Sequence, residues 1–221
     1  MSFTLNKVTS KGANMGTYEP LQEGKYDAVL HAIIGLEMQK HIYLGVDQGV
    51  VNKVLMLFEL PAETRKTKDG DQLPALMSYE LTLSTHEKST FLKVVSALLH
   101  KPLDSRDVET LLESEEGVSS LLGKTCTVTV REYKNKLGQI KNAVKSVTEL
   151  DKRLTQPVAV RDPFVFTVAN PDLDIFRNRL IGWTRDKIMS AINADEFPKA
   201  IHEAYRDIKE LEAETKTNKL V

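Results

Sequence analysis

The sequence predicts a mainly β domain, a small five-stranded barrel with a helix between its third and fourth strands, followed by a helical appendage. Three observations lead to this fold class. Within residues 24–150, three strand-like runs are followed by one helical run and then by two more strand-like runs. Gly35 interrupts the first run, as expected where a barrel strand must bend. Beyond residue 171 the apolar residues recur at helical spacing.

The first three strands are predicted at residues 26–38, 51–60 and 76–83. The first is rich in β-formers, and the second is a nearly continuous apolar run, typical of a strand at the centre of a sheet. Residues 37–50 are predicted to form a loop because they hold Gly45, Asp47 and Gly49. Residues 61–74 are predicted to form a polar loop with an Asp69-Gly70 turn and two prolines.

A helix is predicted next, capped by Ser84 or Thr85 with Glu87 as its capping-box partner, and ended by Pro102. Its apolar residues are Phe91, Val94, Val95, Leu98 and Leu99. Residues 105–122 are predicted as a short helix and loop. Residues 125–133 alternate cleanly, with Cys126, Val128 and Val130 on one face, and the turn at 134–139 joins them to a hairpin partner at 140–150.

Three strands, a helix and two strands form the element order of the OB-fold, a partly open Greek-key barrel. No P-loop or GxGxxG motif is present, which disfavours a doubly wound α/β fold. We therefore divide the chain into an N-terminal arm (1–23), an OB-fold domain (24–150), a connector (151–171) and a helical appendage (172–221). Asp172 is expected to cap the first appendage helix, and the second begins near Pro198. These helices either fold onto their own domain or dock a partner or a second subunit.

Composition bounds the function. The 221 residues include 30 basic and 31 acidic side chains, so a uniformly cationic protein is excluded. The single cysteine, Cys126, excludes a disulfide framework, is expected to be buried, and favours a reducing cytoplasm. The sequence shows no secretory signal and no apolar run near the ~20 residues that a membrane span needs, so neither export nor membrane insertion is expected.

The charges are nevertheless segregated. Residues 121–145 carry six basic side chains against one acid, Glu132. Residues 104–116 carry six acids against one base, Arg106. A basic ribbon of this kind binds a phosphate backbone in a salt-dependent way, although it can equally be a solvated face.

Enzymatic chemistry finds little support. The five histidines form no zinc-binding spacing, and no GxSxG motif is present. We therefore expect no catalytic residue, no metal and no cofactor. A metal-dependent nuclease stays open, because carboxylates from separate strands can converge in the fold.

A nucleic-acid-binding module fits better, since single strands bind to cationic grooves with aromatic faces for the bases. In an OB-fold this surface lies on strands two and three, between the 1–2 and 4–5 loops. Alternation points Tyr133 outward, which makes it the best stacking candidate. Tyr79 lies on the same face of its strand as Met77 and Leu81, so core packing is an alternative to a binding role for this residue. The other candidates from these segments are Tyr43, Lys53, Arg131, Lys134, Lys136 and Lys141.

Several short motifs go beyond the generic pattern: Phe58-Glu59-Leu60, the run from Ser84 to Leu92, and Leu122-Gly123-Lys124-Thr125-Cys126. Over about residues 24–150 the chain resembles the OB-fold single-stranded DNA-binding proteins encoded by tailed phages, notably those of enterobacteria. The resemblance implies non-specific, cooperative coating of single-stranded DNA during phage replication and recombination, with proteins of those processes as partners in the host cytoplasm.

Carried over from this resemblance, the first and third motifs are structural. Lys88 at the helix start is a candidate phosphate contact, because a lysine and free amides suit an anion there. Many such proteins end in an acidic tail tipped by Phe, whereas this chain ends in ETKTNKLV, so partner recruitment would fall to the helices. An OB-type protein-interaction or assembly module remains the alternative from another class, and absence of salt-dependent DNA binding would favour it.

Overall fold

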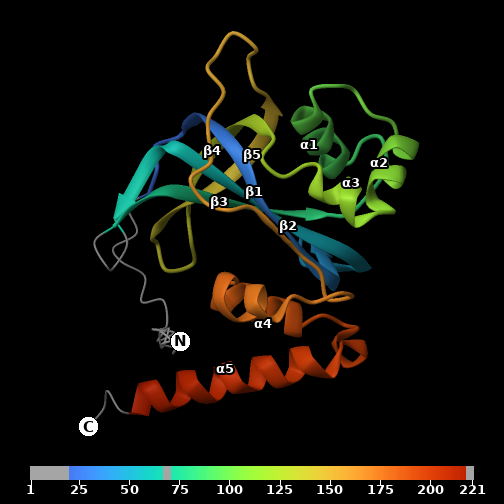
Figure 1. Cartoon of the computed structure of the whole chain (residues 1–221), viewed down its shortest axis with the longest axis vertical. Helices are drawn as coiled ribbons and strands as arrows, with labels where there is room; N and C mark the ends of the chain where they lie inside the picture. Colours follow the sequence, from blue (N-terminus) through green and yellow to red (C-terminus); the bar gives the residue numbers. More distant parts are fainter. Residues whose placement is uncertain (1–19, 67–70, 218–221) are drawn as a thin grey trace, which may run out of the picture.

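A computed structural model describes residues 20–66 and 71–217 of the chain (Figure 1). The strands are β1 (Gly24–Tyr43), β2 (Val46–Lys66), β3 (Gln72–Thr82), β4 (Thr125–Lys134), β5 (Ile140–Glu149) and β6 (Phe164–Phe166). The α-helices are α1 (Thr90–Leu99), α2 (Ser105–Leu112), α3 (Glu115–Ser119), α4 (Gly182–Met189) and α5 (Lys199–Thr217). A π-helical turn at Ile175–Arg179 precedes α4, and a 3-10 turn at Ala194–Glu196 precedes α5.

The strands form one sheet in the order β3-β2-β1-β4-β5, with antiparallel neighbours throughout. β6 lies off this path and pairs in parallel with β1. The prediction of a mainly β fold with helices is confirmed. The sheet is not closed into a barrel, because β3 and β5 form its two edges and do not pair within the described residues. The extra strand β6 falls in the predicted connector, where a three-residue strand is too short to show a pattern.

The bend predicted at Gly35 is present. The register of β1 against β2 shifts between Gly35 and Glu37, and Glu37 adopts a positive φ of 59°. Beyond residue 29, β1 leaves β4 and pairs with β6 through Ala32–Ile34. A Cβ at Gly35 would lie 3.2 Å from a carboxylate oxygen of Glu37, so a side chain there would crowd the bulge.

Two predicted loops are wrong. Residues 37–50 are not a loop but the end of β1 and the start of β2, joined by a two-residue turn at Leu44 and Gly45 with φ of 50° and 81°. Most of residues 61–74 also belongs to strands, while the Asp69-Gly70 signal lies outside the described residues. Both segments project from the core, so backbone pairing holds them as strands without the buried alternation that identifies a strand in sequence.

The helical insertion also differs in detail. The cap of α1 is Ser89, whose Oγ accepts from Leu92 N at 3.0 Å, rather than Ser84 or Thr85. The Ser89 hydroxyl in turn donates to the Ser84 carbonyl, so residues 84–88 form a tight turn before the helix. The acidic stretch forms two helices, α2 and α3, where one helix and a loop were expected; Asp104 caps α2 with a capping box.

The first core lies between one face of the sheet and α1. Phe91, Val95 and Leu98 of α1 are buried against sheet residues such as Met56 and Phe58. Cys126 is fully buried in this core, as predicted, and burial raises the pKa of its thiol to about 12. The cysteine is therefore a small apolar filler here.

The second core covers the opposite face of β1 and β2. Ile34 and Leu55 point into it and are 1% exposed, and β6 adds Phe164 and Phe166. The C-terminal segment contributes Phe176, Leu180, Ile188 and Ile201. Figure 1 shows α4 next to the sheet and α5 beyond it, while α1–α3 lie on another side. The helices therefore fold onto their own sheet, one of the two outcomes expected for their apolar stripes.

A buried carboxylate fastens the segment before β6 to the sheet. Glu59 on β2 is fully buried and accepts from Val160 N at 2.6 Å, Arg161 N at 3.3 Å and Arg161 Nη1 at 3.1 Å. The Arg161 guanidinium also donates to the Pro74 carbonyl at 2.8 Å, which ties the segment to β3. These bonds bring the start of β6 and the helices after it onto the sheet.

Replacing Glu59 with Ala should lower the free energy of unfolding by about 3 kcal/mol, because it leaves the Arg161 guanidinium and two amides without their acceptor. Urea unfolding followed by circular dichroism measures this loss. Glu210→Ala, in an exposed pair with Arg206 at 3.9 Å, is the control and should change stability by no more than about 0.5 kcal/mol. Equal effects of the two substitutions would contradict the role of Glu59.

His31 should make the fold sensitive to mild acid. His31 is 4% exposed, and its burial lowers its pKa from 6.5 to about 4. The charges of Arg179 and Arg161 act in the same direction, and the charge of Glu59 opposes them. Between about pH 6.5 and pH 4, His31 is therefore protonated in the unfolded chain and neutral in the folded chain. Stability is therefore complete above that pH and falls as pH decreases toward 4.

His31→Leu should reduce this loss when urea midpoints are compared at pH 7 and pH 4.5. His41→Leu, near the end of β1 and outside both cores, is the control and should leave the pH dependence as it is in the parent protein. A pH dependence that is the same in the parent and His31→Leu proteins would show that His31 does not carry it.

Candidate nucleic-acid interface

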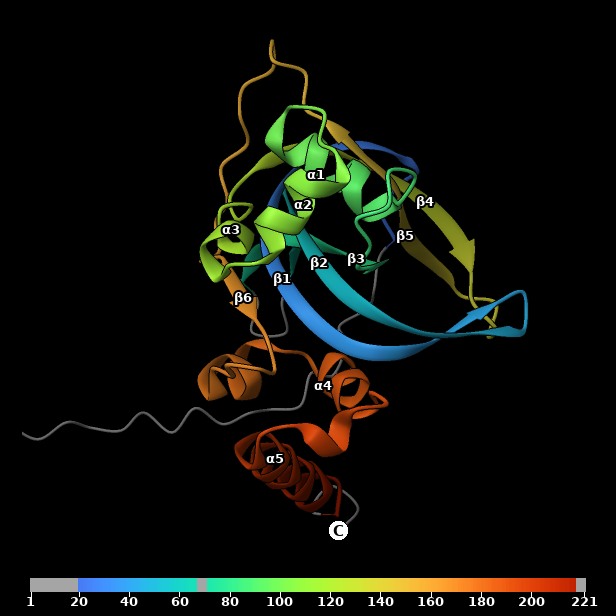
Figure 2. The ribbon, with the colours of Figure 1, turned by 90° about the vertical axis from the view of Figure 1, so that its right-hand side faces the viewer.

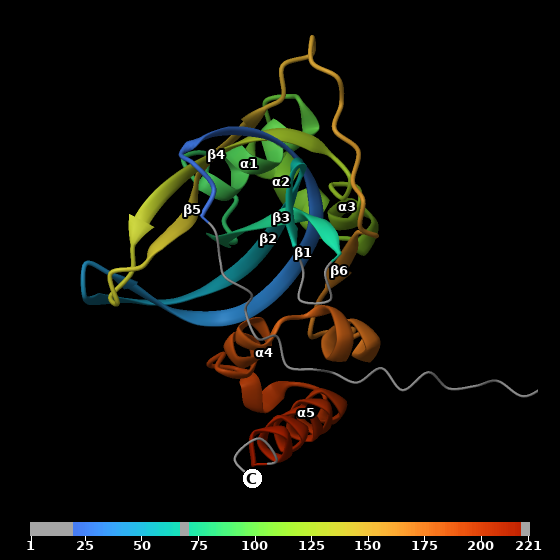
Figure 3. The same cartoon turned by 90° about the vertical axis from the view of Figure 1, so that its left-hand side faces the viewer.

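Two hairpin arms extend from the sheet. The first joins β1 to β2 and the second joins β4 to β5. Figure 2 shows both arms on the same side of the molecule, and Figure 3 shows them again from the opposite direction. Figure 1 shows them on different flanks of the sheet. The arms correspond to the 1–2 and 4–5 connections in which the sequence places most of its binding candidates.

The β4–β5 arm gathers five of the predicted residues. Tyr133 is 45% exposed, and Lys141 lies directly opposite it on β5. Val130 is the last buried residue of β4, so the alternation that points Tyr133 outward is the one expected from the sequence. Arg131, Lys134 and Lys136 are exposed, and no ion pair engages them within the described part of the chain.

The tip of this arm is held by local hydrogen bonds. Asn135 Oδ1 accepts from Leu137 N at 3.0 Å and from Gln139 N at 2.9 Å. Gly138 completes the turn with a φ of 74°. The turn presents Lys136 beside Leu137, which is 81% exposed. A fixed tip of this kind loses little conformational entropy when it meets a ligand.

The β1–β2 arm differs in composition. It carries Lys40 and His41, and Tyr43 is the last residue of β1, although the Tyr43 side chain lies outside the described part of the structure. Ile42, Leu44 and Val46 are 61%, 86% and 58% exposed. These apolar residues were not among the predicted site residues, because residues 37–50 were expected to form a loop. The missed signal is a run of large apolar residues around a Leu-Gly turn.

Lys53 was predicted to meet phosphate, and the structure places its ammonium group in an ion pair. Its Nζ lies 2.7 Å from Glu80 Oε1, and Lys187 of α4 pairs with the other oxygen of the same carboxylate. Burial opposes ionisation of Glu80, but hydrogen bonds from Lys187 and Lys53 outweigh it and lower its pKa. The Lys53 charge is thus already engaged between the sheet and α4.

The outer face of β2 is likewise not the open surface expected of an OB-fold. Leu55 on this face is buried under the C-terminal helices, and Gln39 Nε2 donates to the Lys187 carbonyl of α4 at 3.1 Å. Tyr79 is half-buried and packs against the first core, the competing role considered for it. Burial raises the pKa of Tyr79, while nearby Arg131 opposes the shift. Tyr79 therefore lies near the base of the β4–β5 arm.

Lys88 is exposed and directly precedes the cap of α1. Its backbone N donates to His86 Nδ1 at 3.1 Å, so this amide is engaged in the turn. Figure 2 shows α1 away from the arm tips.

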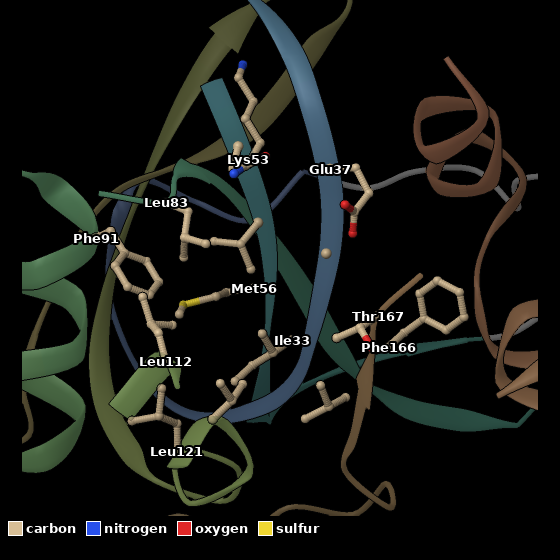
Figure 4. A pocket seen from close by; sticks show the side chains of 15 residues that line it. Ile33, Glu37, Lys53, Met56, Leu83, Phe91, Leu112, Leu121, Phe166 and Thr167 are labelled. Carbon is tan, nitrogen blue, oxygen red and sulfur yellow. The ribbon is translucent and has the colours of Figure 1, made fainter. Parts of the chain in front are cut away.

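A pocket of about 280 Å³ lies between the helices and the sheet (Figure 4). Phe91, Leu112 and Leu121 line it from the helical side, and Ile33 and Met56 line it from the sheet. The lining also includes four polar residues, Glu37, Asn52, Lys53 and Thr167. Lys53, the one cation among the residues that line this pocket, already pairs with Glu80.

Within residues 20–66 and 71–217, no three His, Cys, Asp or Glu side chains converge so that they could hold a metal ion. No helix in these ranges has both the length and the apolar character of a membrane span. No protein-family model matches the sequence, and no curated protein matches it either.

The bridge at Glu80 should help to hold α4 on the sheet. Glu80→Gln removes the charge that Lys53 and Lys187 share and leaves two ammonium groups facing each other. We expect a loss of about 1–2 kcal/mol in the free energy of unfolding. Urea titration of this variant beside Glu203→Gln, an exposed α5 carboxylate 3.2 Å from Lys199, measures it. Losses of equal size would mean that the bridge does not stabilise the fold.

Proposed function

We propose that this protein binds single-stranded DNA, largely independently of sequence and without catalysis. The observation that carries the proposal is the β4–β5 arm, where exposed Tyr133 stands among Arg131, Lys134, Lys136 and Lys141 on a paired hairpin with a hydrogen-bonded tip. Single strands are bound by this combination of an aromatic face for bases and cations for phosphates. The β1–β2 arm, on the same side, adds Lys40 and His41.

The fold supports the same proposal. The strand order β3-β2-β1-β4-β5, with helices between β3 and β4, is compatible with an OB-fold left open between β3 and β5. In that family of folds the 1–2 and 4–5 connections are the parts that grip oligonucleotides. Because α4 covers the outer face of β2, binding would depend on the arms more than on the strands.

The resemblance in residues 24–150 extends the proposal to a biological setting. There the protein would coat single strands during phage DNA replication and recombination in the host cytoplasm, and the proteins of those processes would be its partners.

A second candidate function, a protein-interaction or assembly module, is favoured by one observation. Ile42, Leu44 and Val46 expose large apolar surfaces at the tip of the β1–β2 arm, and such patches commonly mark protein contacts. A second copy of the chain or another protein would then cover the arm. The metal-dependent nuclease has no corresponding observation in its favour.

The test is fluorescence anisotropy of a labelled 20-nucleotide single strand, titrated with protein at two salt concentrations beside duplex DNA. Tyr133→Ala should weaken single-strand binding about tenfold, because stacking contributes ~1–3 kcal/mol per base. Lys134→Ala with Lys136→Ala should weaken binding mainly at low salt and reduce the salt dependence by about two phosphate contacts.

Lys199→Ala, at an exposed position on α5, is the matched control and should leave affinity unchanged. Absence of binding to any strand at low salt would refute the proposed function. Unchanged affinity in a correctly folded Tyr133→Ala protein would remove Tyr133 from the interface.

A further inference from the structure

A second cleft lies on the outer side of β2 and β3, beside the start of α4. It has a volume of about 680 Å³, within the range of ligand sites. Leu57, Leu76 and Ser78 line it from the sheet, and Ile181 and Trp183 line it from the start of α4. The walls of the cleft also include five residues from other parts of the chain: His31, Arg161, Asp162, Phe164 and Arg179. We call this the Trp183 cleft.

The rim of the Trp183 cleft is unusually apolar for an exposed surface. Trp183, the single tryptophan of the chain, is 45% exposed, and Ile181 and Leu76 beside it are 50% and 36% exposed. A tryptophan that only anchored α4 would bury its ring in the second core, as Phe176 does. Here the ring stays accessible at the edge of a cavity.

One cation at this cleft lacks an ionic partner. Arg161 is neutralised by Glu59, whereas Arg179 forms no ion pair within the described residues. The Arg179 guanidinium lies 4.2 Å from the centre of the Phe164 ring and donates to the Asp162 carbonyl. The contacts with Phe164 and Asp162 fix its position without neutralising its charge.

A buried polar atom at the same cleft is also unsatisfied. His31 lines the Trp183 cleft, is 4% exposed, and its Nδ1 has no hydrogen-bond partner in the described structure. The ring is held edge-on against Phe164, with centroids 5.5 Å apart. The Nδ1 atom is itself buried, so it is an unsatisfied group of the cleft wall and not a group that a ligand in the cleft contacts.

These features together fit a nucleotide. An accessible aromatic ring offers a stacking face, Arg179 offers a charge for a phosphate, and exposed Ser78 offers a hydrogen-bonding group for a base edge. An apolar peptide would match the rim but would leave the Arg179 charge unused.

We infer that the Trp183 cleft binds one nucleotide of a single strand, with its base stacked on Trp183 and its phosphate at Arg179. The inference rests on the proposed function and adds to it a contact outside the two arms. Bound strands would then touch the start of α4 as well as the hairpins.

Because the chain has one tryptophan, tryptophan emission excited selectively over that of the six tyrosines reports on this cleft alone. A thymidine 20-mer is titrated into the full-length protein while emission is recorded, and anisotropy of the same labelled strand is measured in parallel. We expect the emission to decrease and to saturate together with the anisotropy. Trp183→Ala should weaken binding about tenfold, and Trp183→Phe should retain most of the affinity because it keeps an aromatic face.

Leu211→Ala, which removes a 54% exposed apolar side chain from α5, is the matched control and should not alter affinity. Urea midpoints test whether each variant folds. If Trp183→Ala does not fold, Trp183→Phe is the variant whose affinity is compared with that of the parent protein.

The outcomes separate the two proposals. Binding with unchanged emission, and equal affinity in Trp183→Ala, would overturn the cleft and leave the arms. Quenching in the parent protein, together with an affinity that falls in Trp183→Ala and not in Tyr133→Ala, would support the cleft and remove Tyr133 from the interface. No binding to the strand in either measurement would refute both.

Discussion

The two central strands are apolar on both faces, and the rest of the structure follows from this constraint. On β2, Met56 and Phe58 point to one side and Leu55 to the other, and all three are buried. A strand of this kind cannot leave either side to water, since each buried leucine or phenylalanine contributes roughly 1.5–3 kcal/mol. Helix α1 covers one face, and β6 with the C-terminal helices covers the other. Without the C-terminal segment, Leu55 and Ile34 would be exposed.

This double coverage moves the candidate interface away from the middle of the sheet. An open face on β2 and β3 would suit a single strand of DNA, but α4 lies over part of it. Lys187 of α4 pairs with the same Glu80 that holds Lys53, and its carbonyl accepts a hydrogen bond from Gln39. What remains accessible are the parts of the sheet that extend beyond the two cores. These are the β1–β2 and β4–β5 arms and the cleft at the start of α4.

The two arms present different kinds of surface. The β4–β5 arm carries the basic residues and Tyr133, and the β1–β2 arm carries mainly apolar residues with Lys40 and His41. A strand of DNA lying between them would meet charge on one flank and apolar contact on the other. The same apolar tip would serve contact between protein copies, so the two proposed functions are compatible in one molecule.

The sequence by itself determined what depends on neighbours along the chain. Alternation identified the buried face of β4, the outward direction of Tyr133 and the burial of Cys126, and Gly35 marked the bulge in β1. Local turn chemistry located the β4–β5 hairpin. These features need only the period of a strand and the conformational freedom of glycine.

Only the tertiary structure decided which candidates are accessible. Lys53 and Lys134 look alike in sequence, yet one is engaged under α4 and the other is exposed on an arm. The exposed ends of β1 and β2 were mistaken for a loop because cross-strand pairing, not burial, forms them. The Trp183 cleft joins residues 31, 57, 78, 161, 179 and 183. Alternation shows which face of a strand a side chain occupies. What covers that face depends on segments more than 100 residues away, as the pair between Lys187 of α4 and Glu80 of β3 shows.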